Sequence, residues 1–286
     1  MPVALITGAS TGIGRSTALR LATAGWTVLA GVRDPAAGER LVADAPAAGR
    51  VIPLTLDVTD AAQIARAAEI VDQETGQGAV PGTGRLDALV NNAGIGFGGP
   101  LELIPVEDLR TQFEVNVVGQ IIVTQAMLPA LRRARGRIVF VSSIGGRVAM
   151  AFTAPYAASK HALEAIGDSL RVELRNSNVQ VALIEPGSVA TPIWNKASAD
   201  AERVSIPAEL QAAYGRVPAA MERVVEDLAE RGIPAEQVAE TIERALTARR
   251  MRARYLVGRD AKAMLFAKRL LPDLVFDRVA RRVLGV

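Results

Sequence analysis

The chain has 286 residues, of which half are hydrophobic and 22% are charged, a balance that suits a protein with a sizeable buried core. It has no cysteine and one histidine, which excludes a disulfide scaffold and thiolate metal ligation and disfavours a zinc site. The N-terminus lacks the pattern of a signal peptide, and no run of about 18 apolar residues predicts a membrane span. We therefore expect a soluble, cytoplasmic protein without a resident metal.

Short apolar runs alternate with alanine- and leucine-rich stretches through most of the chain. The apolar runs predict strands at residues 3–6, 26–30, 51–56, 86–90, 137–141, 179–184 and 254–257. Stretches with helical spacing predict helices at residues 15–25, from about 60 onward, and at 106–131, 155–175 and 235–250. This alternation indicates an α/β fold, a doubly wound parallel sheet of about seven strands with helices on both faces.

No shift in composition marks a domain boundary before about Thr191, so residues 1–286 are expected to form a single domain. Residues 74–85 are rich in glycine and polar side chains and are predicted to be a surface loop. Residues 191–225 are polar and alanine-rich, contain prolines and carry few strand signals. Residues 259–286 form a basic C-terminal extension.

A glycine-rich turn joins the first predicted strand to the first predicted helix. Its sequence is Thr7-Gly8-Ala9-Ser10-Thr11-Gly12-Ile13-Gly14. Glycines let the backbone turn tightly and approach a pyrophosphate at a helix N-terminus. The spacing differs from the usual dinucleotide fingerprint, and the absence of a Gly-Lys-Ser/Thr ending disfavours nucleotide hydrolysis. The turn predicts a dinucleotide site, and a glycine-rich turn without a ligand is the alternative.

The end of the second strand predicts which dinucleotide is preferred. An acidic side chain there would accept a hydrogen bond from a ribose 2′-OH, whereas an arginine would bind a 2′-phosphate. Val32 occupies the position that usually holds the acid, and Arg33 follows it. We therefore predict a preference for NADP(H), with NAD(H) as the alternative if Arg33 is solvated or Asp34 faces the ribose.

Tyr156 and Lys160 lie four residues apart, on one face of a predicted helix, and Ser143 precedes the tyrosine by 13 positions. An ammonium group beside a phenol lowers the phenol pKa, as a tyrosine acid/base requires. A serine hydroxyl could bind the oxygen that is reduced or formed. His161 lies about 100° around the helix from Lys160 and is interpreted as structural.

Taken together, these residues resemble the short-chain dehydrogenase/reductase family in its single-domain form. The resemblance covers roughly residues 3 to 195 and rests on Gly8, Gly12, Gly14, Asp57, Asn91-Asn92-Ala93-Gly94, Asn116, Ser143, Tyr156, Lys160, Pro186-Gly187 and Thr191. The family spacing selects Ser143 over its neighbour Ser142. The resemblance implies a dinucleotide-binding catalytic domain in which residues 191–225 are a mobile substrate loop. Trp194 would have a packing or lid role there.

The resemblance also implies a role for each site residue. Tyr156 would exchange a proton with the substrate oxygen, Lys160 would lower the tyrosine pKa and bind the nicotinamide ribose, and Ser143 would polarise the carbonyl. Asn116 would support a water that relays protons, and Ile184 would line the nicotinamide. The implied cofactor-binding residues are Gly8, Ser10, Thr11, Gly12, Ile13, Gly14, Arg33, Asp57, Val58, Asn92, Ala93, Gly94, Tyr156, Lys160, Pro186, Gly187, Val189 and Thr191.

Residues 156–165 are similar to the branch that acts on retinol and hydroxysteroids. We therefore expect an NADP(H)-preferring oxidoreductase for lipophilic secondary alcohols or ketones. A ketoreductase for small or acyl-chain carbonyls and a non-catalytic dinucleotide sensor are the alternatives. The resemblance further implies a homodimer or homotetramer with contacts through the helices at 106–131 and 155–175.

Residues 249–286 carry eleven basic and three acidic residues, a net charge of +8, so the rest of the chain is at −5. Within them, one helical face is apolar (Val275, Phe276, Val279, Ala280, Val283, Leu284) and the other is mainly basic. Such a helix could pack on its own domain or a second subunit, the favoured interpretation, or lie on an anionic membrane. We hypothesise that it caps a lipophilic substrate entrance. Confined basic charge and only 4% aromatic residues disfavour nucleic-acid binding.

Overall fold

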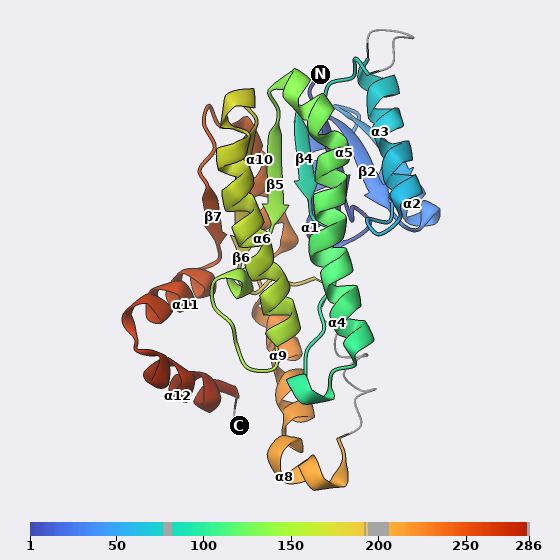
Figure 1. The fold of residues 1–286 in the computed structure, drawn as a ribbon. Helices are drawn as coiled ribbons and strands as arrows, with labels where there is room; N and C mark the ends of the chain where they lie inside the picture. Colours follow the sequence, from blue (N-terminus) through green and yellow to red (C-terminus); the bar gives the residue numbers. More distant parts are fainter. Residues whose placement is uncertain (77–81, 192, 194–205, 285–286) are drawn as a thin grey trace.

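The computed structural model describes residues 1–76, 82–191, 193 and 206–284. Their centre is a single parallel sheet, and Figure 1 shows its strands spread from β7 on the left to β2 on the right. The strands are β1 Val3–Thr7, β2 Thr27–Val32, β3 Arg50–Thr55, β4 Ala88–Asn91, β5 Arg137–Val141, β6 Gln180–Pro186 and β7 Arg254–Val257. Within the described residues the order is β3-β2-β1-β4-β5-β6-β7, and every neighbouring pair is parallel. The predicted doubly wound sheet is confirmed.

Helices cover both faces of the sheet because successive strand residues point to opposite sides. Ala4 and Ile6 of β1 belong to a core formed with α1 Gly12–Thr23, α2 Pro35–Ala43 and α10 Ala235–Thr247. Leu5 belongs to the opposite core, formed with α3 Ala61–Thr75, α5 Gly119–Ala134 and α6 Ala154–Glu173. All five residues of β1 are buried, as expected for a strand covered on both faces.

The strand order reverses between β1 and β4, and this point fixes where a ligand can enter. The chain leaves β1 toward β2 and β3 on one side and continues through β4, β5 and β6 on the other. The loops that follow β1 and β4 therefore diverge, and they leave a crevice at the carboxyl ends of the strands. The glycine-rich turn and the segment that begins Asn91-Asn92 border this crevice.

Three elements differ from the prediction. Helix α2 was not predicted, although it begins with Pro35 at its first position and Asp34 as its N-cap, a recognisable start signal. The predicted helix at 106–131 is α4 Val106–Phe113, a π-helical segment Glu114–Val118 and α5. The predicted loop at 191–225 is helical in its described second half, where a short 3₁₀ turn leads into α8 Gln211–Tyr214 and α9 Val217–Arg231.

Some predictions fall outside the described residues. Residues 77–81 of the predicted surface loop lie outside them, as do residue 192 and residues 194–205 of the predicted substrate loop, including Trp194. Glycines 82 and 84, which bracket the described end of the first loop, donate their N–H groups to the Asp72 carboxylate at 2.6 Å each. Contrary to the expectation of no membrane-length segment, Val106–Ala134 is long and apolar enough to span a bilayer, but half of its apolar window is buried in the fold.

The C-terminal extension forms two helices that project from the body of the molecule (Figure 1). They are α11 Arg259–Leu270 and α12 Asp273–Leu284. Phe276 is buried, with the Lys268 ammonium group 4.9 Å from the centre of its ring. Val275 and Val279, from the same predicted apolar face, are exposed, as are Phe266 and Leu274. The predicted amphipathic helix is present, but it covers less of its apolar face than expected.

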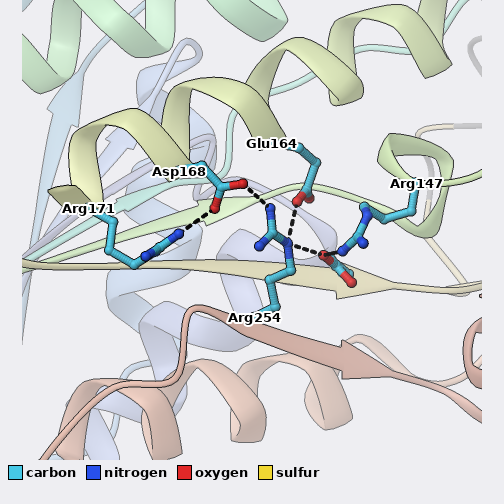
Figure 2. Close-up of polar contacts among 6 residues, drawn as sticks. Arg147, Glu164, Asp168, Arg171 and Arg254 are labelled. Atoms are coloured by element: carbon cyan, nitrogen blue, oxygen red, sulfur yellow. Dashed lines mark hydrogen bonds and ion pairs between the residues drawn. The ribbon is translucent and has the colours of Figure 1, made fainter.

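An ion-pair cluster joins β7 to the middle of α6 and to β6 (Figure 2). Arg254 donates to Glu164 at 2.9 Å and to Asp168 at 2.7 Å, and it lies 3.1 Å from Glu185. Arg147, from the segment before α6, also donates to Glu185, at 3.0 Å. The cluster therefore fixes the last strand of the sheet to the helix that carries Tyr156 and Lys160.

Burial leaves Glu164 with an unusual proton affinity. Burial, aided by the nearby charge of Glu185, raises the pKa of Glu164 from 4.5 to about 7, although Ser142 and Arg254 oppose the rise. Among the described residues, no well-formed hydrogen bond reaches Oε1, one of its carboxylate oxygens, which is buried. Between pH 4.5 and about 7, the folded protein therefore binds more protons at Glu164 than the unfolded chain does. The contribution of Glu164 to the free energy of unfolding is lost as the pH rises through that range.

We predict that Glu164→Gln removes this pH dependence. The free energy of unfolding of the wild type should fall relative to that of the variant as the pH rises from 4.5 to about 7. Urea unfolding across this range measures the difference in slope, which is separate from any constant loss caused by weakening the contact with Arg254. Parallel slopes for the two proteins would contradict the prediction.

The matched control is Asp168→Asn, because hydrogen bonds from Arg254 and Arg171 outweigh burial and lower the Asp168 pKa. Asp168 therefore contributes stability above its unfolded-state pKa that is lost as the pH falls through its folded value, the opposite sign to Glu164.

Candidate active site

The crevice at the carboxyl ends of the strands contains a cavity of about 360 Å³. Loops after β1 to β6 all contribute to its wall. Of the predicted site residues, those that line it are Gly8, Ser10, Thr11, Gly12, Ile13, Arg33, Asp57, Val58, Asn92, Ala93, Gly94, Ser143, Tyr156, Lys160, Pro186, Gly187, Val189 and Thr191. Gly14, Asn116 and Ile184 do not line it.

The glycine-rich turn has a backbone shape that favours glycine. Gly8 and Gly12 have φ angles of 66° and 53°, the left-handed region that favours glycine. A Cβ on Gly14 would lie 2.2 Å from the Gly8 carbonyl oxygen, so Gly14 allows the turn to close on itself and does not face the cavity. The Asn92 side chain donates to the carbonyl oxygens of Thr7 and Gly8 at 2.9 and 3.0 Å, and thus ties the turn to the end of β4.

Arg33 and Asp57 bring opposite charges to the cavity wall, and the arginine is the one that suits a phosphorylated ligand. Arg33 follows β2 and lines the cavity. Burial acts to raise the pKa of Asp57, but hydrogen bonds from Thr59 and the charge of Arg33 outweigh it, and the pKa is lowered. Asp34 accepts the N–H of Ala36 at 3.0 Å as the N-cap of α2, and it is not part of the cavity wall.

Tyr156 and Lys160 lie on the buried face of α6, in its first two turns. The Lys160 ammonium group donates to the Val141 carbonyl oxygen at 2.8 Å and lies 5.7 Å from the centre of the Tyr156 ring. Burial lowers the Lys160 pKa to about 8, partly opposed by the charge of Glu164 one turn further along the helix. Lys160 therefore loses its charge as the pH rises through about 8.

Ser143 stands at the end of β5, next to the tyrosine. Its hydroxyl accepts the N–H of Gly145 at 3.0 Å and hydrogen-bonds Tyr156. Ser142 also reaches the cavity wall, but its buried hydroxyl has no well-formed hydrogen bond within the part of the chain that the structure describes. The His161 ring contacts the Ala157 carbonyl oxygen through Nδ1 at 2.9 Å, outside the cavity wall.

The expected lowering of the Tyr156 pKa by Lys160 is not seen. Burial raises the pKa of Tyr156, and the hydrogen bond with Ser143 offsets only part of the rise. The reason is that desolvation penalises the phenolate. The Lys160 ammonium group meanwhile lies over the ring and is engaged by the Val141 carbonyl.

Asn116 is buried in the π-helical segment, and its side chain bonds to neighbouring residues rather than lining the cavity. Its side chain donates to the Ile95 carbonyl oxygen at 2.9 Å and to the Ser159 hydroxyl at 3.1 Å, and it accepts the Ile95 N–H at 2.8 Å. A Cβ on Gly94 would lie 3.4 Å from Asn116 Oδ1 and 3.8 Å from Lys160 Nζ. Gly94 thus leaves open the gap between Asn116 and Lys160. The water-relay role stays a prediction.

The sequence reasoning missed residues that shape the segment after β4. Gln112 accepts the Phe97 N–H at 2.8 Å, and Gln120 donates to the Ala93 carbonyl oxygen at 2.7 Å. Both glutamines are buried, so a polar side chain on the inward face of the helix was the signal that could have revealed them. The missed cavity-lining side chains include Leu56, Ile95, Phe97, Val115, Val141 and Ile193.

The cavity fits a nicotinamide dinucleotide on two observations. The glycine turn brings backbone close to the cavity at a helix N-terminus, where anions are favoured, and Arg33 supplies a cation at the far end of β2. Bound there, the cofactor would supply or accept a hydride. The chain itself would orient a carbonyl or alcohol oxygen with the Ser143 hydroxyl, exchange a proton at the Tyr156 hydroxyl, and hold positive charge beside it on Lys160.

The sequence and the fold are similar to those of known dehydrogenases and reductases. The short chain dehydrogenase family model matches residues 2–202. The NADPH-dependent 3-dehydrocapnine reductase of Ornithobacterium rhinotracheale is 33% identical over 284 residues, covering 98% of this chain and 96% of that protein. Retinol dehydrogenase 5 of Mus musculus is 36% identical over 289 residues, covering 98% and 87%. A short chain dehydrogenase/reductase from Burkholderia phymatum in complex with NAD has a TM-score of 0.77 and 31% identity, covering 94% and 92%.

The family match extends over more than half of the chain, and both relatives align along nearly all of it. The expected similarity to the retinol and hydroxysteroid dehydrogenase branch is therefore confirmed. The chain belongs to the short-chain dehydrogenase family and is an NAD(P)-dependent oxidoreductase that acts on alcohol and carbonyl groups.

Proposed function

We propose that the protein is an NADP(H)-preferring oxidoreductase that interconverts a lipophilic secondary alcohol and its ketone, or an aldehyde, with a retinoid or steroid as the model substrate class. The observation that carries the cofactor preference is the placement of charges after β2. Arg33 lines the cavity, whereas Asp34 is used to cap α2.

A 2′-phosphate is bound by a cation and is repelled by an acidic side chain at the end of β2. Val32 is buried at the end of β2, where an acidic side chain would otherwise receive the ribose hydroxyl. Asp34 accepts the Ala36 N–H and lies 3.5 Å from Arg40, so its charge is turned toward α2. The guanidinium group of Arg33 is suited to paired hydrogen bonds with phosphate oxygens. A relative that is named as NADPH-dependent supports the same preference.

The cavity wall supports an apolar substrate. Besides Ser143 and Tyr156, the cavity wall includes the apolar residues Ile95, Phe97 and Val115. Apolar surface of this kind favours a ligand with hydrocarbon next to the reacting oxygen. A relative of similar length is named a retinol dehydrogenase, in line with this substrate class.

Two alternatives predict different behaviour. A ketoreductase for small or acyl-chain carbonyls would use the same Ser143–Tyr156–Lys160 group but would not gain rate from a large apolar substrate. A non-catalytic dinucleotide sensor would bind cofactor and turn over no substrate. The buried Lys160 disfavours the sensor, because a buried ammonium group costs folding free energy that a binding protein has no need to spend.

Arg33→Ala should weaken NADPH binding by about tenfold to a hundredfold and leave NADH binding nearly unchanged, since a charged hydrogen bond contributes roughly 1.5–3 kcal/mol. Titration calorimetry with each cofactor measures the two affinities. Arg66→Ala is the matched control, because this exposed arginine pairs with Glu69 on α3 and lies outside the cavity wall. An equal loss for both cofactors in Arg33→Ala would remove the argument for preference.

Substrate class is tested by steady-state kinetics on retinoid, steroid, short aliphatic and aromatic carbonyls, followed by nicotinamide absorbance. We expect the highest kcat/KM for the retinoid or steroid carbonyls with NADPH. Comparable or higher values for the short aliphatic carbonyls would favour the ketoreductase alternative. Absence of turnover across the panel would favour the sensor.

Tyr156→Phe should lower kcat by about 10²-fold to 10⁴-fold, because it removes the hydroxyl that exchanges the proton. The affinity for the cofactor should stay nearly unchanged, because the aromatic ring is kept. Single-turnover kinetics and calorimetry separate the two effects. Retained turnover would refute the proton donor, and a large loss of cofactor affinity would mean that the ring position, rather than the proton, had changed.

A further inference from the structure

The start of the C-terminal extension contacts the loop that follows β6. Asp260, in the first turn of α11, accepts the N–H of Ser188 at 2.6 Å. The preceding N–H, that of Gly187, donates to the carbonyl oxygen of Val257 at 2.9 Å. Two consecutive amides of the loop are therefore held by residues 257–260, on either side of Gly258.

Two glycines make room for the Asp260 carboxylate. A Cβ on Gly187 would lie 2.4 Å from both carboxylate oxygens of Asp260. A Cβ on Gly258 would lie 2.4 Å from one of them, and Gly258 has a φ of 105°, which side chains rarely adopt. The carboxylate thus occupies the space directly above the Gly187 backbone. Its place in the first turn of a helix is electrostatically favourable for an anion.

The same loop forms one wall of the cavity. Pro186, Gly187 and Val189 line it. On the other side of the loop, Ile233 accepts the Ala190 N–H at 3.0 Å and donates to the Ser188 carbonyl oxygen at 2.9 Å. The wall is therefore held from two directions, by Ile233 and by the pair Val257 and Asp260.

We propose that Asp260 is a positioning residue that holds the Gly187–Ser188 wall of the cofactor cavity, so that the C-terminal extension helps to set cofactor affinity. The inference rests on the nicotinamide dinucleotide occupying this cavity, and it does not depend on the preference for NADP(H). Asp260 is itself exposed and is not in the cavity wall, so it acts only through the loop. Without its carboxylate the Ser188 N–H can bond to water, and the loop has more conformations to lose when the cofactor binds.

The test uses Asp260→Ala in the full chain, with two readouts. Calorimetry should show NADPH and NADH affinities lowered by the same factor, about threefold to tenfold. Hydrogen exchange without cofactor should show faster exchange in the peptide that contains Ser188. Asp260→Asn keeps an acceptor oxygen and should restore most of both properties. Asp273→Ala is the matched control, because this acid pairs with Lys268 within the extension at 2.6 Å and should change neither.

The outcomes separate this inference from the proposed function. Arg33 governs the ratio of NADPH to NADH affinity, whereas Asp260 should change both affinities together. Unchanged affinity and unchanged exchange in a folded Asp260→Ala protein would overturn the proposal. A change in the NADPH to NADH ratio would overturn it too, because it would place Asp260 on the phosphate rather than on the loop.

A double-mutant cycle tests the contact between Asp260 and the Gly187 wall directly. Gly187→Ala should weaken cofactor binding strongly in the wild-type background, because the new Cβ meets the Asp260 carboxylate. In the Asp260→Ala background the same substitution should cost several-fold less, since that clash is gone. Equal costs in the two backgrounds would contradict a direct coupling between Asp260 and the wall.

Discussion

The buried ammonium group of Lys160 is the constraint on which the rest of the structure depends. A charged side chain inside a protein needs partners that offset its lost hydration. Here the Val141 carbonyl at the end of β5 accepts its hydrogen bond, and Glu164 adds negative charge one turn along α6. Because the lysine cannot move far from the Val141 carbonyl, α6 must lie against the end of β5. That placement puts Tyr156 beside Ser143.

Two sets of long-range contacts keep this arrangement in register. Arg254 of β7 holds α6 through Glu164 and Asp168, and Asn116 joins the segment after β4 to Ser159 on the same helix. Neither set reaches the substrate oxygen. Both act by fixing the helix and the loops between which a dinucleotide would lie, so the C-terminal third of the chain contributes to a site whose chemistry is located in the first two thirds.

Much of the fold could be predicted from local patterns. Buried parallel strands appear in the sequence as continuous apolar runs. The turn after β1 can be recognised by glycines such as Gly8 and Gly12, which permit positive φ angles. The spacing of Tyr156 and Lys160 places them on one helical face without any knowledge of the fold. Helix α2 was missed even though Asp34 and Pro35 form a standard helix start, so this was an overlooked signal rather than an absent one.

Other features were beyond local patterns because they depend on distant partners. The hydrogen bond from the Ser188 N–H to Asp260 joins residues 72 positions apart, and the pairing of Arg254 with Glu164 spans 90. The raised pKa of Tyr156 follows from burial, which spacing does not reveal.

The central claim is that one cleft holds the dinucleotide with its reactive end against Tyr156 and its ribose phosphate against Arg33. A crystal structure of the protein with NADP⁺ tests it most directly. The account predicts the pyrophosphate at the glycine turn Gly8–Gly14, the 2′-phosphate within hydrogen-bond distance of the Arg33 guanidinium group, and the nicotinamide ring facing the Tyr156 and Ser143 hydroxyls. A nicotinamide ring turned away from Tyr156, or a dinucleotide bound outside this cleft, would contradict it.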